Sequence, residues 1–266
     1  MSETILYEIR DRIAYITLNR PDALNAMNLD FLRRWGFIVQ DMNNNPEALV
    51  GIVTGAGGKA FSVGADLKEK SGVSRPAAPG ASGTGEGQTV VERKPGGKRP
   101  RLIQKPVIAA INGFCLGGGL ELALQCDIRI ATPKSVFGMP EPRWSLPAGY
   151  GLHNLSRMIP LGEALYIQLT GERIGPERAY QIGLIQKIVP EEQLMEEAKK
   201  IADSVLLCAP LAVRAIKSVV MSYRDQPLEV SWKMAEGLVD ELSKTEDFKE
   251  GPKAFAEKRK PQWKGR

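Results

Sequence analysis

The chain has 266 residues, of which 43% are hydrophobic and 25% are charged, a composition typical of a globular protein with one large domain. No run approaches the roughly 18 apolar residues that a membrane helix requires. One histidine, His153, and three cysteines without a Cys-x-x-Cys pair argue against the usual zinc site and against a histidine-based triad. The net charge of +5 fits either nucleic acid or a polyanionic small molecule, so charge alone does not select a partner.

The chain begins without the basic segment and apolar core of a secretory signal. We therefore expect the mature protein to begin near Met1 and to stay in the cytoplasm. Cys115 and Cys126 are predicted to be small buried side chains rather than nucleophiles. His153 is predicted to be a partly buried hydrogen-bonding residue.

Two strands joined by a turn at residues 11 and 12 are predicted for residues 4–18, the second being rich in β-branched and aromatic side chains. A helix follows, with Asn28 or Asp30 as its N-cap. The sequence Asn-Asn-Asn-Pro at 43–46 ends this helix.

Residues 49–54 form a short apolar run of the kind found in buried parallel strands. The glycine-rich segment after it does not fit a Walker A loop, because Val53 stands where that loop needs glycine and Ala60 where it needs serine or threonine.

Residues 71–100 are rich in Gly, Pro and Ser and carry a basic cluster at 93–99. No aromatic residues interleave this cluster to stack RNA bases.

The stretch 105–141 combines a buried strand, a run of glycines and two acids. The strand is predicted at 107–111, and the triplet 117–119 consists of glycines that lead into a helical pattern. Without Cβ atoms, N–H groups at such a helix start can point at a ligand oxygen, as in an oxyanion hole. Glu121 falls in the first turn, where the helix dipole favours an ionised carboxylate, so it is a candidate base.

The second acid, Glu141, stands between Pro140 and Pro142. These prolines predict extended backbone and a stiff support for the carboxyl group. Taken singly, a glycine run indicates packing and a lone glutamate indicates a solvated surface. Together and in this order, these features indicate a catalytic site.

Beyond residue 160 the apolar period is that of helices. Two short helices are predicted, the second starting at Pro176, followed by three amphipathic helices with apolar faces within 194–205, 212–220 and 232–242. Strands with intervening helices up to Ala131, followed by helices alone, predict an α/β core with a helical tail.

The runs INGFCLGGGLELALQCDIRIA and FGMPE, with GKAFSVGADLKE upstream, resemble the crotonase superfamily, and enoyl-CoA hydratase most of all. The resemblance covers nearly the whole chain, and the 20-residue spacing of its paired glutamates (141 − 121 = 20) matches the hydratases. It implies the crotonase spiral of ββα units. The core would span 1–200, with 71–100 as an expanded surface loop, and 201–266 would form a helical C-terminal region for trimerisation.

The resemblance also implies the site. Glu121 and Glu141 would be catalytic, and the N–H groups of Ala65 and Gly118 would form the oxyanion hole. Lys68 would reach the adenine or phosphate end of coenzyme A (CoA), and the segment from Phe255 would reach a neighbouring subunit's CoA. The full set of implied substrate and CoA contacts is Ala23, Leu24, Ala26, Ala65, Asp66, Leu67, Lys68, Gly117, Gly118, Trp144, Phe255 and Lys258.

The implied reaction is the addition of water across the 2,3 double bond of a 2-enoyl-CoA thioester. The implied assembly is a homotrimer or a dimer of trimers, with no metal and no cofactor other than the CoA of the substrate, no membrane partner, and no nucleic acid. Where relatives usually carry Pro-Gly-x-Gly-Gly, this chain has Pro-Ala-Gly-Tyr-Gly at 147–151. Trp144 and Tyr150 are large enough to reshape the acyl pocket. The resemblance therefore indicates the type of reaction more directly than it indicates which acyl group the substrate carries.

Other functions stay open on the same residues. An enoyl-CoA isomerase, or another acyl-CoA lyase or hydrolase of the superfamily, would use the same scaffold, and isomerisation needs only one acid. An RNA-binding or scaffolding member of the fold would need neither. The loop 71–100 is predicted either to act as a lid over the acyl pocket or to be a passive insertion.

Overall fold

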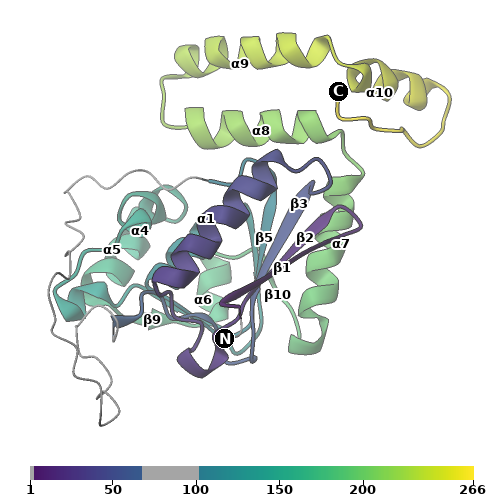
Figure 1. Ribbon diagram of the computed structural model, residues 1–266. Helices are drawn as coiled ribbons and strands as arrows, with labels where there is room; N and C mark the ends of the chain where they lie inside the picture. The colour runs from purple at the N-terminus through teal and green to yellow at the C-terminus, as the bar shows by residue number, and fades with distance from the viewer. Residues whose placement is uncertain (1–2, 68–101) are drawn as a thin grey trace, which may run out of the picture.

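The computed structural model describes residues 3–67 and 102–266, and it arranges them as a core of two sheets, with helices around it and a helical arm at the C-terminus (Figure 1). The strands are β1 (Ile5–Arg10), β2 (Ile13–Leu18), β3 (Val50–Gly55), β4 (Ala60–Ser62), β5 (Val107–Ile111), β6 (Phe114–Leu116), β7 (Ile128–Ala131), β8 (Val136–Gly138), β9 (Arg173–Ile174) and β10 (Lys187–Ile188). The α-helices are α1 (Leu29–Asn44), α3 (Gly118–Leu124), α4 (Tyr150–Asn154), α5 (Leu161–Thr170), α6 (Pro176–Gln181), α7 (Leu194–Leu206), α8 (Pro210–Tyr223), α9 (Leu228–Ser243) and α10 (Glu246–Ala256). The 3₁₀ helices are η1 (Pro21–Ala23), η2 (Glu141–Trp144), η3 (Leu155–Arg157) and η4 (Glu191–Gln193).

The larger sheet has six strands in the order β1-β2-β3-β5-β7-β10. The predicted hairpin is confirmed, since β1 and β2 pair antiparallel across a turn in which Asp11 and Arg12 both have positive φ. The next strands run parallel, and β5 is apolar throughout while β3 carries Thr54 as its one polar side chain, as expected of strands covered on both faces. The predicted helix is α1, and Asn28 caps it by accepting a hydrogen bond from the N–H of Phe31 at 2.9 Å.

The smaller sheet has four strands in the order β4-β6-β8-β9. Three successive strand pairs, β3–β4, β5–β6 and β7–β8, each place their first strand in the larger sheet and their second in the smaller one. The chain therefore climbs through both sheets as a spiral of ββα units, which confirms the predicted fold.

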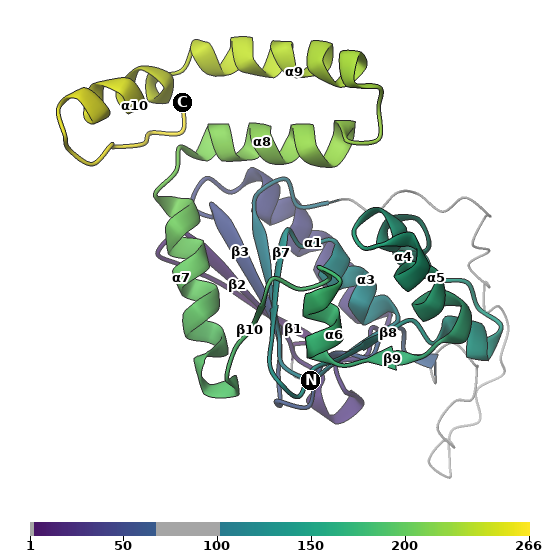
Figure 2. The same cartoon turned by 180° about the vertical axis from the view of Figure 1, so that it is seen from behind.

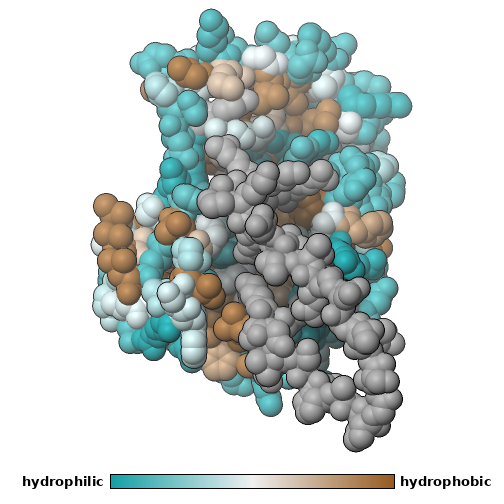
Figure 3. Space-filling model, turned by 60° about the vertical axis from the view of Figure 1, so that its left-hand side comes forward, coloured by the Kyte–Doolittle hydropathy of each residue, from teal (hydrophilic) through white to brown (hydrophobic). Residues whose placement is uncertain are grey.

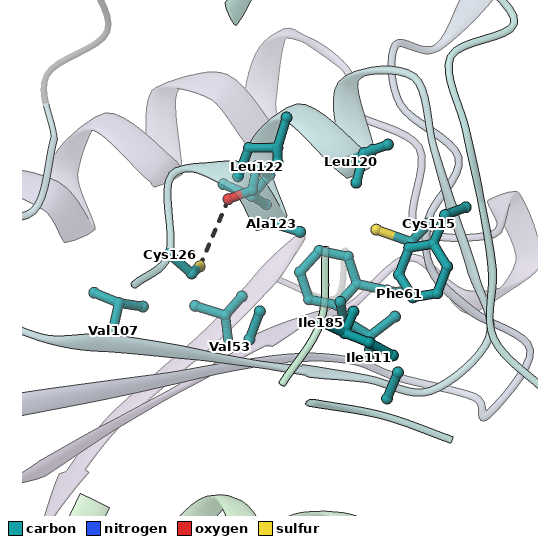
Figure 4. Packing of buried hydrophobic residues seen from close by; sticks show 14 of the residues in the cluster. Val53, Phe61, Val107, Ile111, Cys115, Leu120, Leu122, Ala123, Cys126 and Ile185 are labelled. Atoms are coloured by element: carbon teal, nitrogen blue, oxygen red, sulfur yellow. Dashed lines mark hydrogen bonds between the residues drawn. The ribbon is translucent and has the colours of Figure 1, made fainter. Parts of the chain in front are cut away.

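Two apolar clusters form the core. One lies between the sheets and includes α1 and α3, and the other lies between the larger sheet and α7, through residues such as Leu194, Ala198 and Ala202. Figure 4 shows part of the first cluster, where Phe61 and Cys115 pack beside Leu120. Cys115 and Cys126 are both buried, as predicted, and burial raises the pKa of each thiol, which for Cys126 reaches about 12.

The predictions of where strands stop and of the burial of His153 are wrong. Strands do not stop at Ala131, because β8, β9 and β10 follow it; each has only two or three residues, too short for a period-2 pattern to be visible. His153 is exposed rather than partly buried, because it lies on the outer face of the one-turn helix α4.

The C-terminal arm consists of α8, α9 and α10, stands above the core and carries the C-terminus back along α10 (Figures 1 and 2). The predicted boundary at 200/201 falls inside α7, whose apolar face packs on the larger sheet. Within residues 3–67 and 102–266, no single helix is long and apolar enough to cross a membrane. One bent pair, Glu191–Leu206 with Pro210–Ser222, passes this test by length and composition.

Candidate active site

The glycine run forms the turn from β6 into α3. Gly117, the N-cap of α3, has φ +52, a conformation that side chains disfavour. Its N–H donates to the carbonyl of Gly138 at 2.9 Å, which ties the turn to β8. Gly118 is therefore the first residue of α3, and its N–H belongs to the group that a helix leaves without an internal acceptor.

The backbone of residues 64 and 65 lies directly against Gly118. A Cβ on Gly64 would lie 2.6 Å from the N of Gly118, and a Cβ on Gly118 would lie 3.5 Å from the N of Ala65. These two segments, far apart in sequence, can approach so closely only because residue 64 lacks a side chain, whereas a Cβ at residue 118 would make ordinary contacts.

Ala65 pairs with Met27 in a parallel bridge, in which the N–H of Met27 donates to Gly64 and the N–H of Asp66 donates to Met27. The N–H of Ala65 therefore points to the opposite side. Within the described part of the chain, neither this N–H nor that of Gly118 has a hydrogen-bond acceptor. Both residues are half-buried, so two neighbouring donors face accessible space.

Glu121 lies one turn further along α3 and is held by the start of α4. Its Oε1 accepts hydrogen bonds from the N–H of Gly149 and, at 3.0 Å, from the N–H of Gly151. The carboxylate thus caps α4, as an acidic group at a helix start commonly does. Since a carboxylate accepts through both oxygens, Oε2 stays available for a further donor.

The carboxyl group of Glu141 lies against the same turn. A Cβ on Gly117 would lie 3.0 Å from Oε1 of Glu141. Gly117 is the N-cap of α3, and Glu121 lies in the first turn of the same helix. The structure therefore brings both acids near the start of α3, beside the N–H groups of Ala65 and Gly118.

The prediction of extended backbone at Glu141 is wrong, because Glu141 is the first residue of the 3₁₀ helix η2. The N–H of Arg143 donates to the carbonyl of Pro140 at 3.1 Å and closes the turn. Pro142 has no N–H, but this turn does not require a hydrogen bond from residue 142. The support is stiff all the same, since the guanidinium of Arg143 pairs with Glu172 and donates to the carbonyl of Thr170.

A buried polar network joins the loop 19–28, which carries the implied CoA contacts Ala23, Leu24 and Ala26, to the Ala65 segment. Asn25 is fully buried, and its side chain accepts from the N–H of Arg20 and donates to the carbonyls of Ala56 and Ala60. The guanidinium of Arg20 donates to the carbonyl of Ala26 and pairs with Asp66 at 3.0 Å. Asp66 therefore lies in this network rather than free in solvent.

The remaining predicted contacts fall into three groups. Ala23 and Leu24 are half-buried in the same loop, and Ala26 is buried. Leu67 and Trp144 are exposed, Trp144 to 65%. Phe255, 87% exposed, belongs to α10, and Lys258 follows this helix. In both views α10 lies well away from α4 and α5 (Figures 1 and 2). Lys68 and the loop 71–100 lie outside the described residues.

The sequence interpretation missed the groups that hold these pieces in place. Arg20 and Asn25 lie in an unremarkable loop, and the only visible sign was that asparagine tolerates the left-handed backbone that Asn25 adopts, φ +56. The Gly149–Gly151 turn was noticed for the size of Tyr150, not for its N–H groups. Tyr150 itself is half-buried against the core, and burial raises the pKa of its phenol. No three His, Cys, Asp or Glu side chains in the described ranges gather into a group that could hold a metal ion.

The comparisons with known proteins agree along the whole chain. The family model described as enoyl-CoA hydratase/isomerase matches residues 8–266. The chain is 36% identical to the short-chain-enoyl-CoA hydratase of Clostridium acetobutylicum, over 96% of this chain and 95% of that protein. It is also 36% identical to the (E)-benzylidenesuccinyl-CoA hydratase of Thauera aromatica, over 98% and 99% respectively. The crystal structure of enoyl-CoA hydratase from Mycobacterium tuberculosis H37Rv superposes with a TM-score of 0.87 at 34% identity and covers 100% of both chains.

Proposed function

This chain belongs to the enoyl-CoA hydratase/isomerase family, and from that premise we propose that it adds water across the 2,3 double bond of a 2-enoyl-CoA thioester to give a 3-hydroxyacyl-CoA. The observation that carries the proposal is the placement of two carboxyl groups, Glu121 and Glu141, near the start of α3 beside two backbone donors without acceptors in the described chain.

The thioester carbonyl would accept hydrogen bonds from the N–H groups of Ala65 and Gly118. Negative charge grows on this oxygen as the nucleophile adds to C3, and fixed donors stabilise it without reorganisation. One such donor is commonly worth about 3 kcal/mol in the transition state. The thioester group is thereby held with its double bond toward the two acids.

Water would lie between the carboxyl groups. Oε2 of Glu121 accepts a proton from the water as its oxygen bonds to C3, and Glu141, protonated at the outset, delivers a proton to C2. The proton gained by one acid balances the proton lost by the other. Two carboxyl groups sharing one water repel when both are ionised, which favours opposite protonation states and so separates the roles.

We propose that no cofactor takes part beyond the CoA of the substrate, because these two acids and two donors supply every proton and charge that hydration moves. We also propose a homotrimer or a dimer of trimers, built through the arm, with Phe255 and Lys258 of one subunit near the CoA of the next. Exposed apolar side chains on α8 and α9 support this assembly (Figure 3). A cytoplasmic location remains a prediction from the sequence.

The test is substitution of each acid by its isosteric amide. Glu121→Gln and Glu141→Gln keep shape but cannot exchange protons, so each should lower the hydratase kcat by roughly 10² to 10⁴ with a modest change in acyl-CoA affinity. The double variant should be little worse than either single one, because the two residues act as a unit. The measurement is loss of the conjugated-thioester absorbance over a panel of enoyl-CoA esters that differ in chain length and aromaticity.

The family description also includes isomerases, in which a single acid moves one proton between two carbons. If Glu121→Gln keeps its activity while Glu141→Gln is inactive, double-bond isomerisation replaces hydration as the function. A wild-type chain that turns over no enoyl-CoA yet binds RNA with a steep salt dependence would contradict both.

A further inference from the structure

A cavity lies at the hinge between the core and the arm, and neither Glu121 nor Glu141 lines it. It has a volume of about 620 Å³. Its walls come from the β1–β2 turn, the end of α1, the start of β5, the α7–α8 connection and the C-terminal tail 261–265. In Figure 1 the β1–β2 turn, the end of α1 and the α7–α8 connection meet just below the arm. We call it the hinge cavity.

The charges around the hinge cavity are unbalanced. Arg12, Lys105 and Arg214 line it, and within the described residues none of the three has a carboxylate partner. Lys264 also lines it but is paired with Glu246. Against these cations, the lining contains a single acid, Glu47.

Lys105 is the most constrained of these cations, since only 4% of it is exposed. Its Nζ donates to the carbonyl of Asn45 at 2.6 Å, which uses one of three ammonium protons. Burial, and then the neighbouring charge of Arg214, lower the pKa of Lys105. The charge of Asp41 raises this pKa in part, but the Asp41 carboxylate accepts hydrogen bonds from Tyr7 and Asn45 and forms no ion pair with Lys105. A bound anion would therefore stabilise this buried ammonium beside its guanidinium neighbour.

We propose that the hinge cavity binds a small phosphate-bearing anion, at a site separate from the thioester site. The volume falls in the range of small-ligand pockets, roughly 300 to 1,000 Å³. Guanidinium and ammonium groups are the side chains that recognise phosphate, through charge-assisted hydrogen bonds. Because Lys105 belongs to the core and Arg214 to the arm, a ligand that contacts both fastens one to the other.

The first experiment is a calorimetric titration with inorganic pyrophosphate and, separately, with ADP. The protein is kept saturated with butyryl-CoA, so that the thioester site is occupied, and chloride holds the ionic strength constant. We expect one saturable site per chain. Equal affinity for the two probes assigns the site to phosphate anions as such, and tighter binding of ADP assigns it to nucleotides, which would use the wall formed by Trp263.

Alkylation of Cys208 tests whether the anion binds in the hinge cavity. It lines the hinge cavity and is the exposed cysteine of the chain, whereas Cys115 and Cys126 are buried. Alkylation of Cys208 by iodoacetamide, followed by peptide mass spectrometry, should slow as pyrophosphate is added, with the midpoint found by calorimetry. Alkylation that stays unchanged while pyrophosphate binds would place the anion elsewhere and overturn the proposal.

Arg214→Gln should weaken pyrophosphate binding about tenfold or more, the loss of one charge-assisted contact. Arg33→Gln is the matched control, because Arg33 is exposed on α1 and does not line the cavity, and it should leave the affinity unchanged. Lys105→Met should also abolish pyrophosphate binding if the variant folds. If it does not fold, Arg12→Gln takes its place as the second test and should weaken pyrophosphate binding. Saturable binding that Arg214→Gln leaves intact, or no saturable binding in the wild type, would overturn the proposal.

Discussion

Gly118 offers a way to remove one oxyanion donor while the helix keeps its start. It is the first residue of α3, a position at which proline is favoured, so Gly118→Pro should fold. Proline has no N–H, so we expect the rate to fall by roughly 10² to 10³, the usual effect of losing one such donor. The measurement is the hydratase kcat/KM of the purified variant, with circular dichroism as the check on folding.

Gly118→Ala separates the lost donor from the added side chain. A Cβ at this position would lie 3.4 Å from the Cα of Gly64, an ordinary contact, so the alanine variant should keep most of its activity. If a folded Gly118→Pro variant retained a rate near that of wild type, the N–H of Gly118 would have no part in the oxyanion hole.

At the scale of elements, the buried Asn25 network should decide whether the loop after β2 is formed at all. Asn25→Ala would leave the N–H of Arg20 and the carbonyls of Ala56 and Ala60 without their partners. Buried polar groups left unsatisfied cost about 1 to 3 kcal/mol each, and water recovers part of that, so we expect a loss of about 2 to 4 kcal/mol. Urea unfolding measures it.

Asn44→Ala is the matched control for this loss. Asn44 is exposed at the end of α1, and no hydrogen bond of its side chain is found in the described part of the chain. Its replacement should change the free energy of unfolding by less than about 0.5 kcal/mol. Equal effects of the two substitutions would mean that the Asn25 network does not hold the loop.

The elements of the fold could be predicted where sequence pattern is strong. The hairpin, the capped helix α1, the strands β3 and β5 and the start of α6 at Pro176 all follow from local chemistry, such as the asparagine cap and the apolar strand runs. The strands β9 and β10 could not be predicted, because two residues pair only when a neighbouring strand already stands beside them.

The candidate site likewise has parts that could be predicted from the sequence and parts that could not. The glycine run and both glutamates stand out in the sequence, because their chemistry lies within one short stretch. The anchors of Glu121 could not be predicted, since they are backbone N–H groups of Gly149 and Gly151, 28 and 30 residues away, and carry no residue-type signal. The contact of Gly64 with Gly118 likewise exists only once the two sheets have been assembled.

At the scale of the whole molecule, the arm should govern the state of assembly. Trp232 on α9 is 68% exposed in a single chain, and Val239 on the same helix is also exposed. If the arm forms the contact between subunits, Trp232→Glu places a charge in an apolar interface and should give the 29.1 kDa monomer. Light scattering during size-exclusion chromatography measures the mass.

Lys233→Glu is the control for assembly, because it introduces the same residue at an exposed polar position of α9. It should keep the mass of the wild type. A wild-type chain that is monomeric, or a Trp232→Glu variant with unchanged mass, would show that the arm does not carry the assembly.

The anchoring of Glu121 ties the position of its carboxylate to the turn that carries Tyr150. Both N–H groups that hold this carboxylate flank Tyr150, so a mutation that enlarges or shifts this turn to admit a different acyl group also displaces the carboxylate. The turn has little slack, since a Cβ on Gly151 would lie 2.0 Å from Cε of Met139. A lineage selected on a bulkier substrate would therefore pass through slow intermediates, and its descendants should carry compensating changes at position 139.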